Sequence, residues 1–143
     1  MRIQEGEGWR LALDLTRQPR PVLLGGRDWA SELRPEECAL LARAVAILLQ
    51  QHRDLAPMLM REEEIELDVE LALPAAGALW VSLKGSRESW GLRFILTPGP
   101  SSDRALEGSW DSGSSAALAA ALAQLARELA TETDGPCPAD QQC

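Results

Sequence analysis

The chain has 143 residues, of which 45% are hydrophobic, and this suits one compact domain with a single core. Its formal net charge of −8 at pH 7 gives an average surface that repels phosphate backbones and anionic lipids, and no dense cluster of lysine and arginine offsets it. No apolar run approaches the roughly 20 residues that span a bilayer, so a membrane helix is excluded.

Three short strands are predicted before the first helix. Residues 8–14 alternate between apolar and polar side chains, which is typical of a half-buried strand. Two prolines within residues 16–21 interrupt this pattern. Residues 22–24 then resume as a strand, and the glycine-rich stretch 25–28 predicts a tight turn into a third strand over residues 29–33.

A long helix is predicted from Arg34 to about Ala56. Pro35 suits the first helical turn, and the two glutamates after it meet the positive end of the helix dipole. A wide apolar stripe predicts that a sheet covers this helix, whereas Glu37 falls at a more solvent-like position. The stripe contains Cys38, Leu41, Val45, Leu48 and His52. Pro57 is expected to end the helix, because proline lacks the amide donor.

The stretch from residue 64 to residue 73 is the most regular in the chain. It alternates strictly, which predicts a strand with one core face and one acidic face. The apolar set is Ile65, Leu67, Val69, Leu71 and Leu73, and the acidic set is Glu64, Glu66, Asp68 and Glu70. A helix would scatter both sets around its surface.

Three further strands and a closing helix are predicted after the acidic strand. Residues 78–84 form its hairpin partner, and residues 90–97 and 105–110 alternate in the same way. Residues 115–130 place leucines at spacings of four, three and four, which predicts a helix with one buried seam. The tryptophans on or beside these strands are expected to fill core corners, namely Trp9, Trp29, Trp90 and Trp110.

This order predicts an α+β fold. We expect one antiparallel sheet of about seven strands in the order βββα-ββββα, with two helices on one face and the other face open to solvent. The domain covers residues 1–130, and residues 131–143 are rich in proline and polar residues, so a disordered tail is expected there.

Two groups on the open face are candidate functional residues. The acidic row offers carboxylates for a divalent cation or for acid–base chemistry, but neighbours on one face of a strand lie roughly 6.6 to 7 Å apart, so a solvated surface is the simpler interpretation. Trp80 and Arg93 should project from the same face, and these residue types are favoured at binding hot spots. With Glu66 and Glu70 they form the candidate partner-binding face. The alternative is a cation–π or arginine–glutamate contact that serves only the sheet surface.

No catalytic, cofactor-binding or metal-binding residues are predicted. Ser109 and Ser112 have no histidine and aspartate partners nearby in the sequence, and His52 falls on the apolar side of its helix. Cys38 is interpreted as a small buried hydrophobe, and the other two cysteines fall in the tail, so neither a disulfide framework nor a metal-spaced set is present. Arg2 is followed by acidic residues rather than by the apolar stretch of an export signal. A cytoplasmic location is therefore expected.

Several clusters together resemble a small cyanobacterial family catalogued as domain of unknown function 1818. They are Gly8-Trp9-Arg10-Leu11, Leu24-Gly25-Gly26, Asp28-Trp29-Ala30, Glu32-Leu33, Leu59-Met60, Glu62-Glu63, Ile65, Leu79-Trp80, residues 92–96 and Glu107-Gly108-Ser109-Trp110. That family looks like the Whirly-type single-stranded-DNA-binding transcriptional regulator fold. The resemblance implies units of four strands and a helix, and it brings no established activity. The acidic open face and the tail depart from what such a DNA-binding protein would show.

The resulting hypothesis is a non-enzymatic adaptor or regulatory domain that binds a protein partner, or a second copy of itself, through the open sheet face. The alternative is a single-stranded nucleic-acid-binding transcriptional regulator, which the fold resemblance suggests and the charge opposes. A small-ligand site or an enzyme ranks third. Fold alone does not decide among these.

Overall fold

The computed structural model describes residues 1–74, 76–99 and 104–134, and within them the chain forms eight strands and two long helices. The first unit contains β1 (Arg2–Gly6), β2 (Trp9–Leu13), β3 (Val22–Gly25), β4 (Ala30–Leu33), α1 (Pro35–Leu55) and the short 3-10 helix η1 (Ala56–Met58). The second contains β5 (Ile65–Ala72), β6 (Gly77–Gly85), β7 (Trp90–Pro98), β8 (Leu106–Trp110) and α2 (Ser115–Asp134). The order is therefore four strands and a helix, twice.

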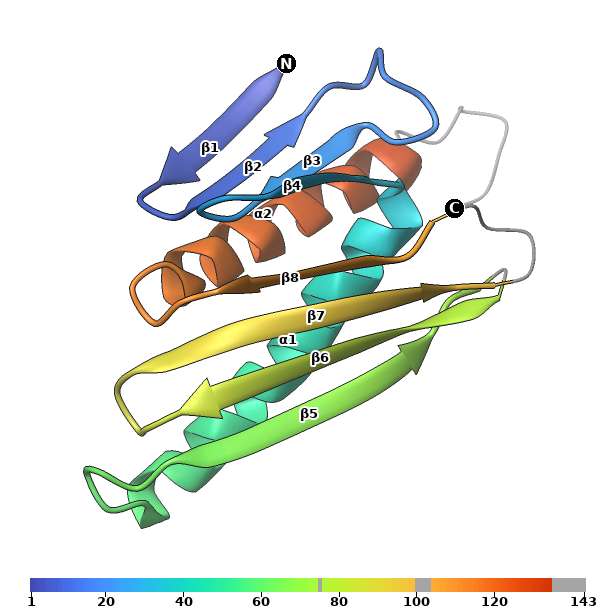
Figure 1. Cartoon of the computed structure of the whole chain (residues 1–143). Coiled ribbons are helices and arrows are strands. Elements are labelled where there is room, and N and C mark those ends of the chain that lie inside the picture. The colour runs from blue at the N-terminus through green and yellow to red at the C-terminus, as the bar shows by residue number, and fades with distance from the viewer. Residues whose placement is uncertain (75, 100–103, 135–143) are drawn as a thin grey trace.

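The strands form two four-stranded antiparallel sheets, in the orders β1-β2-β3-β4 and β5-β6-β7-β8. Each strand pairs with the next one along the chain, and both helices lie on the same side of the sheets (Figure 1). The α+β class is confirmed, but the single sheet of about seven strands and the βββα-ββββα order are wrong. Strand β1 was not predicted because Ile3 is its only large apolar residue, and that side chain is 55% exposed.

The core lies between the sheets and the helices. The predicted alternation on β6 and β7 is confirmed, since every second side chain is buried, and the leucine seam of α2 is buried as well. These residues are Leu79, Val81, Leu83, Leu92, Phe94, Leu96, Leu118, Leu122, Leu125 and Leu129. Each fully buried leucine stabilises the fold by roughly 1.5 to 3 kcal/mol relative to exposure. The stripe on α1 is also buried, as predicted.

The boundaries of the helices are close to those predicted, with two differences. Helix α1 begins at Pro35 and ends at Leu55, and Pro57 falls in the 3-10 turn that follows. Helix α2 continues to Asp134, so the first four residues of the predicted tail are helical. The remainder of that tail lies outside the described residues.

Glu37 is buried, which contradicts its predicted solvent-like position. Only 7% of the residue is exposed, because Arg104 from the segment before β8 covers it. The Arg104 guanidinium donates to the Glu37 carboxylate at 2.6 and 3.2 Å and to the carbonyl of Glu32 at 2.8 Å. The same carboxylate accepts the backbone N–H of Arg34 at 2.8 Å, so it also satisfies the start of α1. One buried ion pair therefore connects the two halves of the chain.

Two indole rings join the sheets where no ladder does. Trp29, in the turn before β4, donates its Nε1–H to the carbonyl of Ser109 at 3.1 Å, and Trp110 on β8 donates to the carbonyl of Gly25 at 3.0 Å. The ring centroids of Trp29 and Trp110 are 5.2 Å apart. Gly108 makes room for Trp29, because a Cβ there would lie 2.5 Å from the ring. Both tryptophans fill a core corner, as predicted.

Candidate functional site

The open face of the sheet β5-β6-β7-β8 is the side that the helices do not cover (Figure 1). All four candidate residues lie on it. The register places Glu70 of β5 opposite Trp80 of β6, and Glu66 opposite Lys84. Ser82 lies between Asp68 and Arg93 of the flanking strands. Alternation within each strand predicted this common face, whereas the role of the residues in binding stays a prediction.

Trp80 is held in place by its neighbours. Its Nε1–H donates to the Asp68 carboxylate at 3.0 Å, and the guanidinium carbon of Arg93 lies 5.9 Å from the centre of the ring. Arg93 also forms an ion pair with Glu107 of β8 at 3.8 Å. Alternation within a strand does not predict these contacts of Asp68 and Glu107, because cross-strand partners depend on a register that periodicity does not give.

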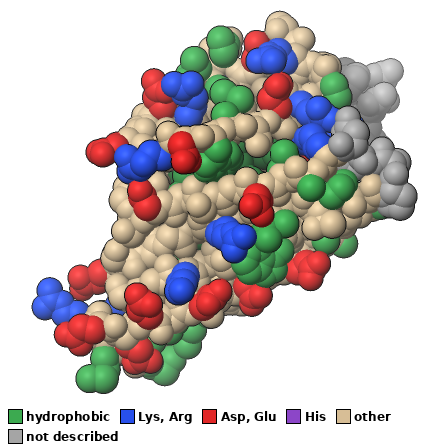
Figure 2. All heavy atoms as spheres, in the orientation of Figure 1, with side chains coloured by type: hydrophobic (Ala, Val, Ile, Leu, Met, Phe, Trp, Pro, Cys, Tyr) green, Lys and Arg blue, Asp and Glu red, His purple; other side chains and the backbone are tan. Residues whose placement is uncertain are grey.

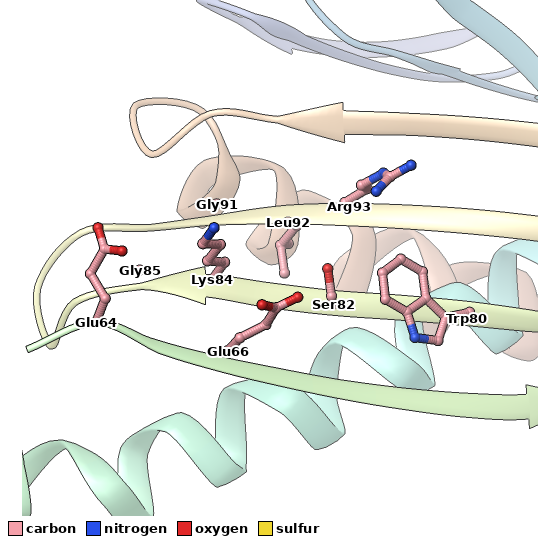
Figure 3. A pocket seen from close by; sticks show the side chains of 9 residues that line it. All are labelled: Glu64, Glu66, Trp80, Ser82, Lys84, Gly85, Gly91, Leu92 and Arg93. Atoms are coloured by element: carbon pink, nitrogen blue, oxygen red, sulfur yellow. The ribbon is translucent and has the colours of Figure 1, made fainter.

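A shallow hollow of about 400 Å³, called here the sheet hollow, opens beside this pair. Figure 3 shows Trp80 and Arg93 at one end of it and Glu64, Glu66 and Lys84 towards the other. The remaining lining residues are Ser82, Gly85, Gly91 and Leu92. Ser82 is only 6% exposed although it lies on the open face, because longer side chains surround it. Ser82 therefore lies at the bottom of the hollow, and charged side chains surround it.

Both signs of charge are present around the sheet hollow. Figure 2 shows acidic side chains along the margin that β5 forms in Figure 1, with basic and apolar side chains on the strands next to it. The lining residues include no histidine or cysteine, and Ser82 supplies the only hydroxyl. In the described part of the chain, no group of three or more histidine, cysteine, aspartate or glutamate residues is arranged to hold a metal ion. This chemistry suits the recognition of a polar or charged segment.

Among the described residues, the one histidine and the one cysteine lie in the interior instead. His52 is 6% exposed, its Nε2 lies 3.1 Å from the carbonyl oxygen of Ser86, and its ring packs against Trp90. Cys38 is fully buried, and burial raises the pKa of its thiol to about 12. Both match the predicted structural roles, because neither side chain is accessible.

A second hollow, of about 340 Å³, lies at the hairpin ends of the first sheet. It is lined by glycines of both turns together with Trp9, Trp29, Arg10 and Arg27. Arg10 pairs with Glu5 at 2.8 Å, and Arg27 pairs with Asp111 at 2.9 Å. The hydrogen bond from Arg27 is the largest cause that holds the pKa of Asp111 below its usual value. Both arginines of this second hollow therefore already pair with carboxylates of the chain, and we assign no ligand to the hollow.

Neither helix, over the residues described, combines the length and apolarity needed to cross a bilayer.

Comparisons with known proteins place the chain among sequences without an assigned activity. The model of a family described as a domain of unknown function, DUF1818, matches residues 4–125. A crystal structure of a protein of unknown function from Prochlorococcus sp. NATL2A, described as from the DUF155 family, is similar in fold with a TM-score of 0.77 and 30% identity. The similarity covers 87% of this chain and 98% of that one. No curated protein matches significantly. These findings do not bear on the likeness to the Whirly fold, which stays a prediction.

Proposed function

The chain belongs to the DUF1818 family, whose description assigns no activity, and we propose that it is a non-enzymatic adaptor or regulatory domain. In this proposal it binds a protein partner through the open face of the β5-β6-β7-β8 sheet. The contact centres on Trp80 and Arg93, and Glu66 and Glu70 form its acidic side.

The observation that carries the proposal is the fixed position of Trp80 on a solvent-facing surface. Its indole is only half-buried, yet Asp68 and Arg93 hold it from two sides. Tryptophan and arginine supply a large share of binding energy at protein interfaces. A side chain that is already ordered loses less conformational entropy on binding than a mobile one. The pair is thus suited to anchor a partner.

The shape of the sheet hollow supports a protein or peptide ligand over a small substrate. The hollow is shallow and open to solvent along the sheet, whereas small-molecule sites enclose most of the ligand. Glu66 and Lys84 face each other across the strands, so the rim offers both a carboxylate and an ammonium group. A polypeptide segment can present side chains of both charges to these two groups.

The charge of the face opposes the nucleic-acid alternative. Single-strand binders combine stacking aromatic residues with a positive groove that follows the phosphates. Here Trp80 offers a stacking surface, but the neighbouring strand presents Glu66, Asp68 and Glu70 to the same side. We therefore expect no binding to a mixed-sequence single-stranded oligonucleotide tighter than about 10 μM at physiological salt, which is weaker than specific complexes usually are.

The test compares affinity capture by the wild-type chain and by Trp80→Ala and Arg93→Glu. Arg43→Glu makes the same charge change at an exposed position on α1 and serves as the control. Captured proteins are identified by mass spectrometry, and the affinity of the most enriched one is then measured with purified material. We expect the two face variants to bind at least about tenfold more weakly, the loss that truncation of a hot-spot residue produces, while the control binds normally.

Two results would contradict the proposal. One is equal affinity of the wild type and both face variants, with all of them folded by circular dichroism. The other is tight, salt-sensitive binding of a labelled oligonucleotide that Arg93→Glu abolishes, because affinity for single strands falls with salt in proportion to the phosphates neutralised. That second result would favour the single-stranded nucleic-acid-binding regulator.

A further inference from the structure

Strand β5 is an edge strand of its sheet, so it pairs with a neighbouring strand, β6, on one side only. All eight of its residues pair in continuous register with β6. Among the described residues, no strand or backbone hydrogen bond lies along its other edge, and Figure 1 shows β5 as the outermost strand. An edge of this length offers a row of backbone donors and acceptors to another chain.

The hydrogen-bond pattern identifies which backbone groups face outward. Beyond the end of β5, the N–H of Leu73 donates to the carbonyl of Gly77 at 3.0 Å, which makes this a hydrogen-bonded pair. Hydrogen-bonded and non-hydrogen-bonded pairs alternate along an antiparallel ladder. The odd-numbered residues of β5 therefore bond to β6. The even-numbered residues, Glu66, Asp68, Glu70 and Ala72, direct their N–H and C=O groups to the free edge.

The side chains of β5 form two rows that differ in chemistry. The row towards the core is Ile65, Leu67, Val69 and Leu71, and all four remain only half-buried. The row on the open face is acidic and exposed over Glu66, Asp68 and Glu70. Charged side chains, proline, an inward-pointing charge and a bulge are common devices that protect an edge. Strand β5 has the first in its acidic row and none of the other three. An added strand would bury more of the apolar row.

The acidic row also restricts which strand is compatible with this edge. If two copies paired antiparallel through β5 with their apolar rows on the same side, glutamates and aspartates would lie directly opposite one another. Like charges at opposing positions destabilise a strand pair. A strand with lysine or arginine at alternate positions would instead place a cation against each carboxylate, with aliphatic residues between them next to the apolar row.

We propose that the free edge of β5 accepts an extended segment of a partner protein as a fifth strand of this sheet. The segment alternates basic and aliphatic residues, and its backbone bonds to the outward-facing groups of Glu66, Asp68 and Glu70. The contact shares Glu66 and Glu70 with the open face, but it uses the backbone edge and does not require Trp80 or Arg93.

The test uses a fluorescent ten-residue peptide in which lysine and arginine alternate with valine and isoleucine. A control peptide has the same composition with all basic residues at one end. Binding is measured by anisotropy, and backbone amide exchange is followed by nuclear magnetic resonance with and without peptide. We expect the alternating peptide to bind at least about tenfold more tightly than the control. It should slow exchange at the even-numbered amides of β5, while the odd-numbered amides are protected in either state.

Two variants at one position separate backbone pairing from charge attraction. Glu70→Gln removes the charge and keeps the outward N–H, so we expect affinity to fall about threefold, as for an exposed ion pair. Glu70→Pro also removes the outward N–H, which β6 does not use, and affinity should fall about tenfold or more. Arg43→Gln, at an exposed position of α1 away from this edge, should change peptide affinity by less than about twofold.

Four results would overturn the proposal. The first is no saturable binding of the alternating peptide at millimolar concentration. The second is equal binding of the two peptides, and the third is binding that leaves the even-numbered amides unprotected; either would indicate charge attraction alone. The fourth is concentration-dependent dimerisation of the free protein that protects the same amides, because the occupant would then be a second copy. The exchange pattern of the wild type is decisive even if Glu70→Pro does not fold.

Discussion

The ion pair between Glu37 and Arg104 gives the sharpest test of how the two halves of the chain are held together. The exposed fractions of the two side chains are 8% and 15%, so both charges are largely removed from water. Arg104→Met would remove the guanidinium donors and leave the Glu37 carboxylate with the N–H of Arg34, the other donor to it within the described residues. Breaking a buried pair by removing one partner costs about 3 to 5 kcal/mol. We therefore expect Arg104→Met to lower the free energy of unfolding by about that amount.

The double variant provides the measurement that isolates the pair. Replacing both members of a buried ion pair by apolar residues is often nearly neutral. Glu37→Met combined with Arg104→Met should therefore cost at least about 2 kcal/mol less than the sum of the single changes, as determined by urea denaturation of all four proteins. Arg43→Met, at an exposed position of α1, should stay within about 0.5 kcal/mol of the wild type. Additive single effects, or a loss below about 1 kcal/mol for Arg104→Met, would refute the reasoning.

Three further outcomes are expected. Gly108→Ala should cost about 1 to 3 kcal/mol in urea denaturation, because its Cβ would lie 2.5 Å from the Trp29 ring, while Gly113→Ala, whose nearest contact would be 3.4 Å away, should be close to neutral. With the two tail cysteines replaced by serine, Cys38 should react with a disulfide reagent at pH 8 only after urea unfolds the chain. Burial raises the pKa of the Cys38 thiol from 9.0 to about 12. The contribution of the protonated thiol to the free energy of unfolding is therefore complete below pH 9 and is lost as the pH rises towards 12.

The sequence was informative wherever a surface is buried on one side. The alternation over residues 64–73 and 90–97 predicted both faces of β5 and β7, because a period of two assigns side chains to opposite sides. Strand β1 has exposed or half-exposed side chains throughout, so burial imposes no pattern on it. Periodicity also does not tell which strands share a ladder, and this is why two sheets were predicted as one.

The sequence predicted which residues share the open face, but it did not predict the contacts that they make. Trp80 and Arg93 belong to one face by alternation alone. The bond from Trp80 to Asp68 and the burial of Ser82 depend on cross-strand register, which turns and core packing set together. The burial of Glu37 shows the same limit for a helix, because a partner 67 residues away covers a position that looks exposed within its own turn.

Strand pairs within each sheet and the indole contacts between the sheets differ in how far apart their residues lie in the sequence. Every ladder in both sheets joins strands that are consecutive in sequence, so each is closed by a short connection with a small entropic cost. The bonds from Trp29 to Ser109 and from Trp110 to Gly25 instead join residues 80 and 85 positions apart. Long-range contacts of this kind are the slow part of forming a topology. Strand pairing within each sheet is therefore local. The packing of α1 on β6, the packing of α2 on β2 and the contacts of the two indoles join distant parts of the chain, and we expect the folding rate to depend on them.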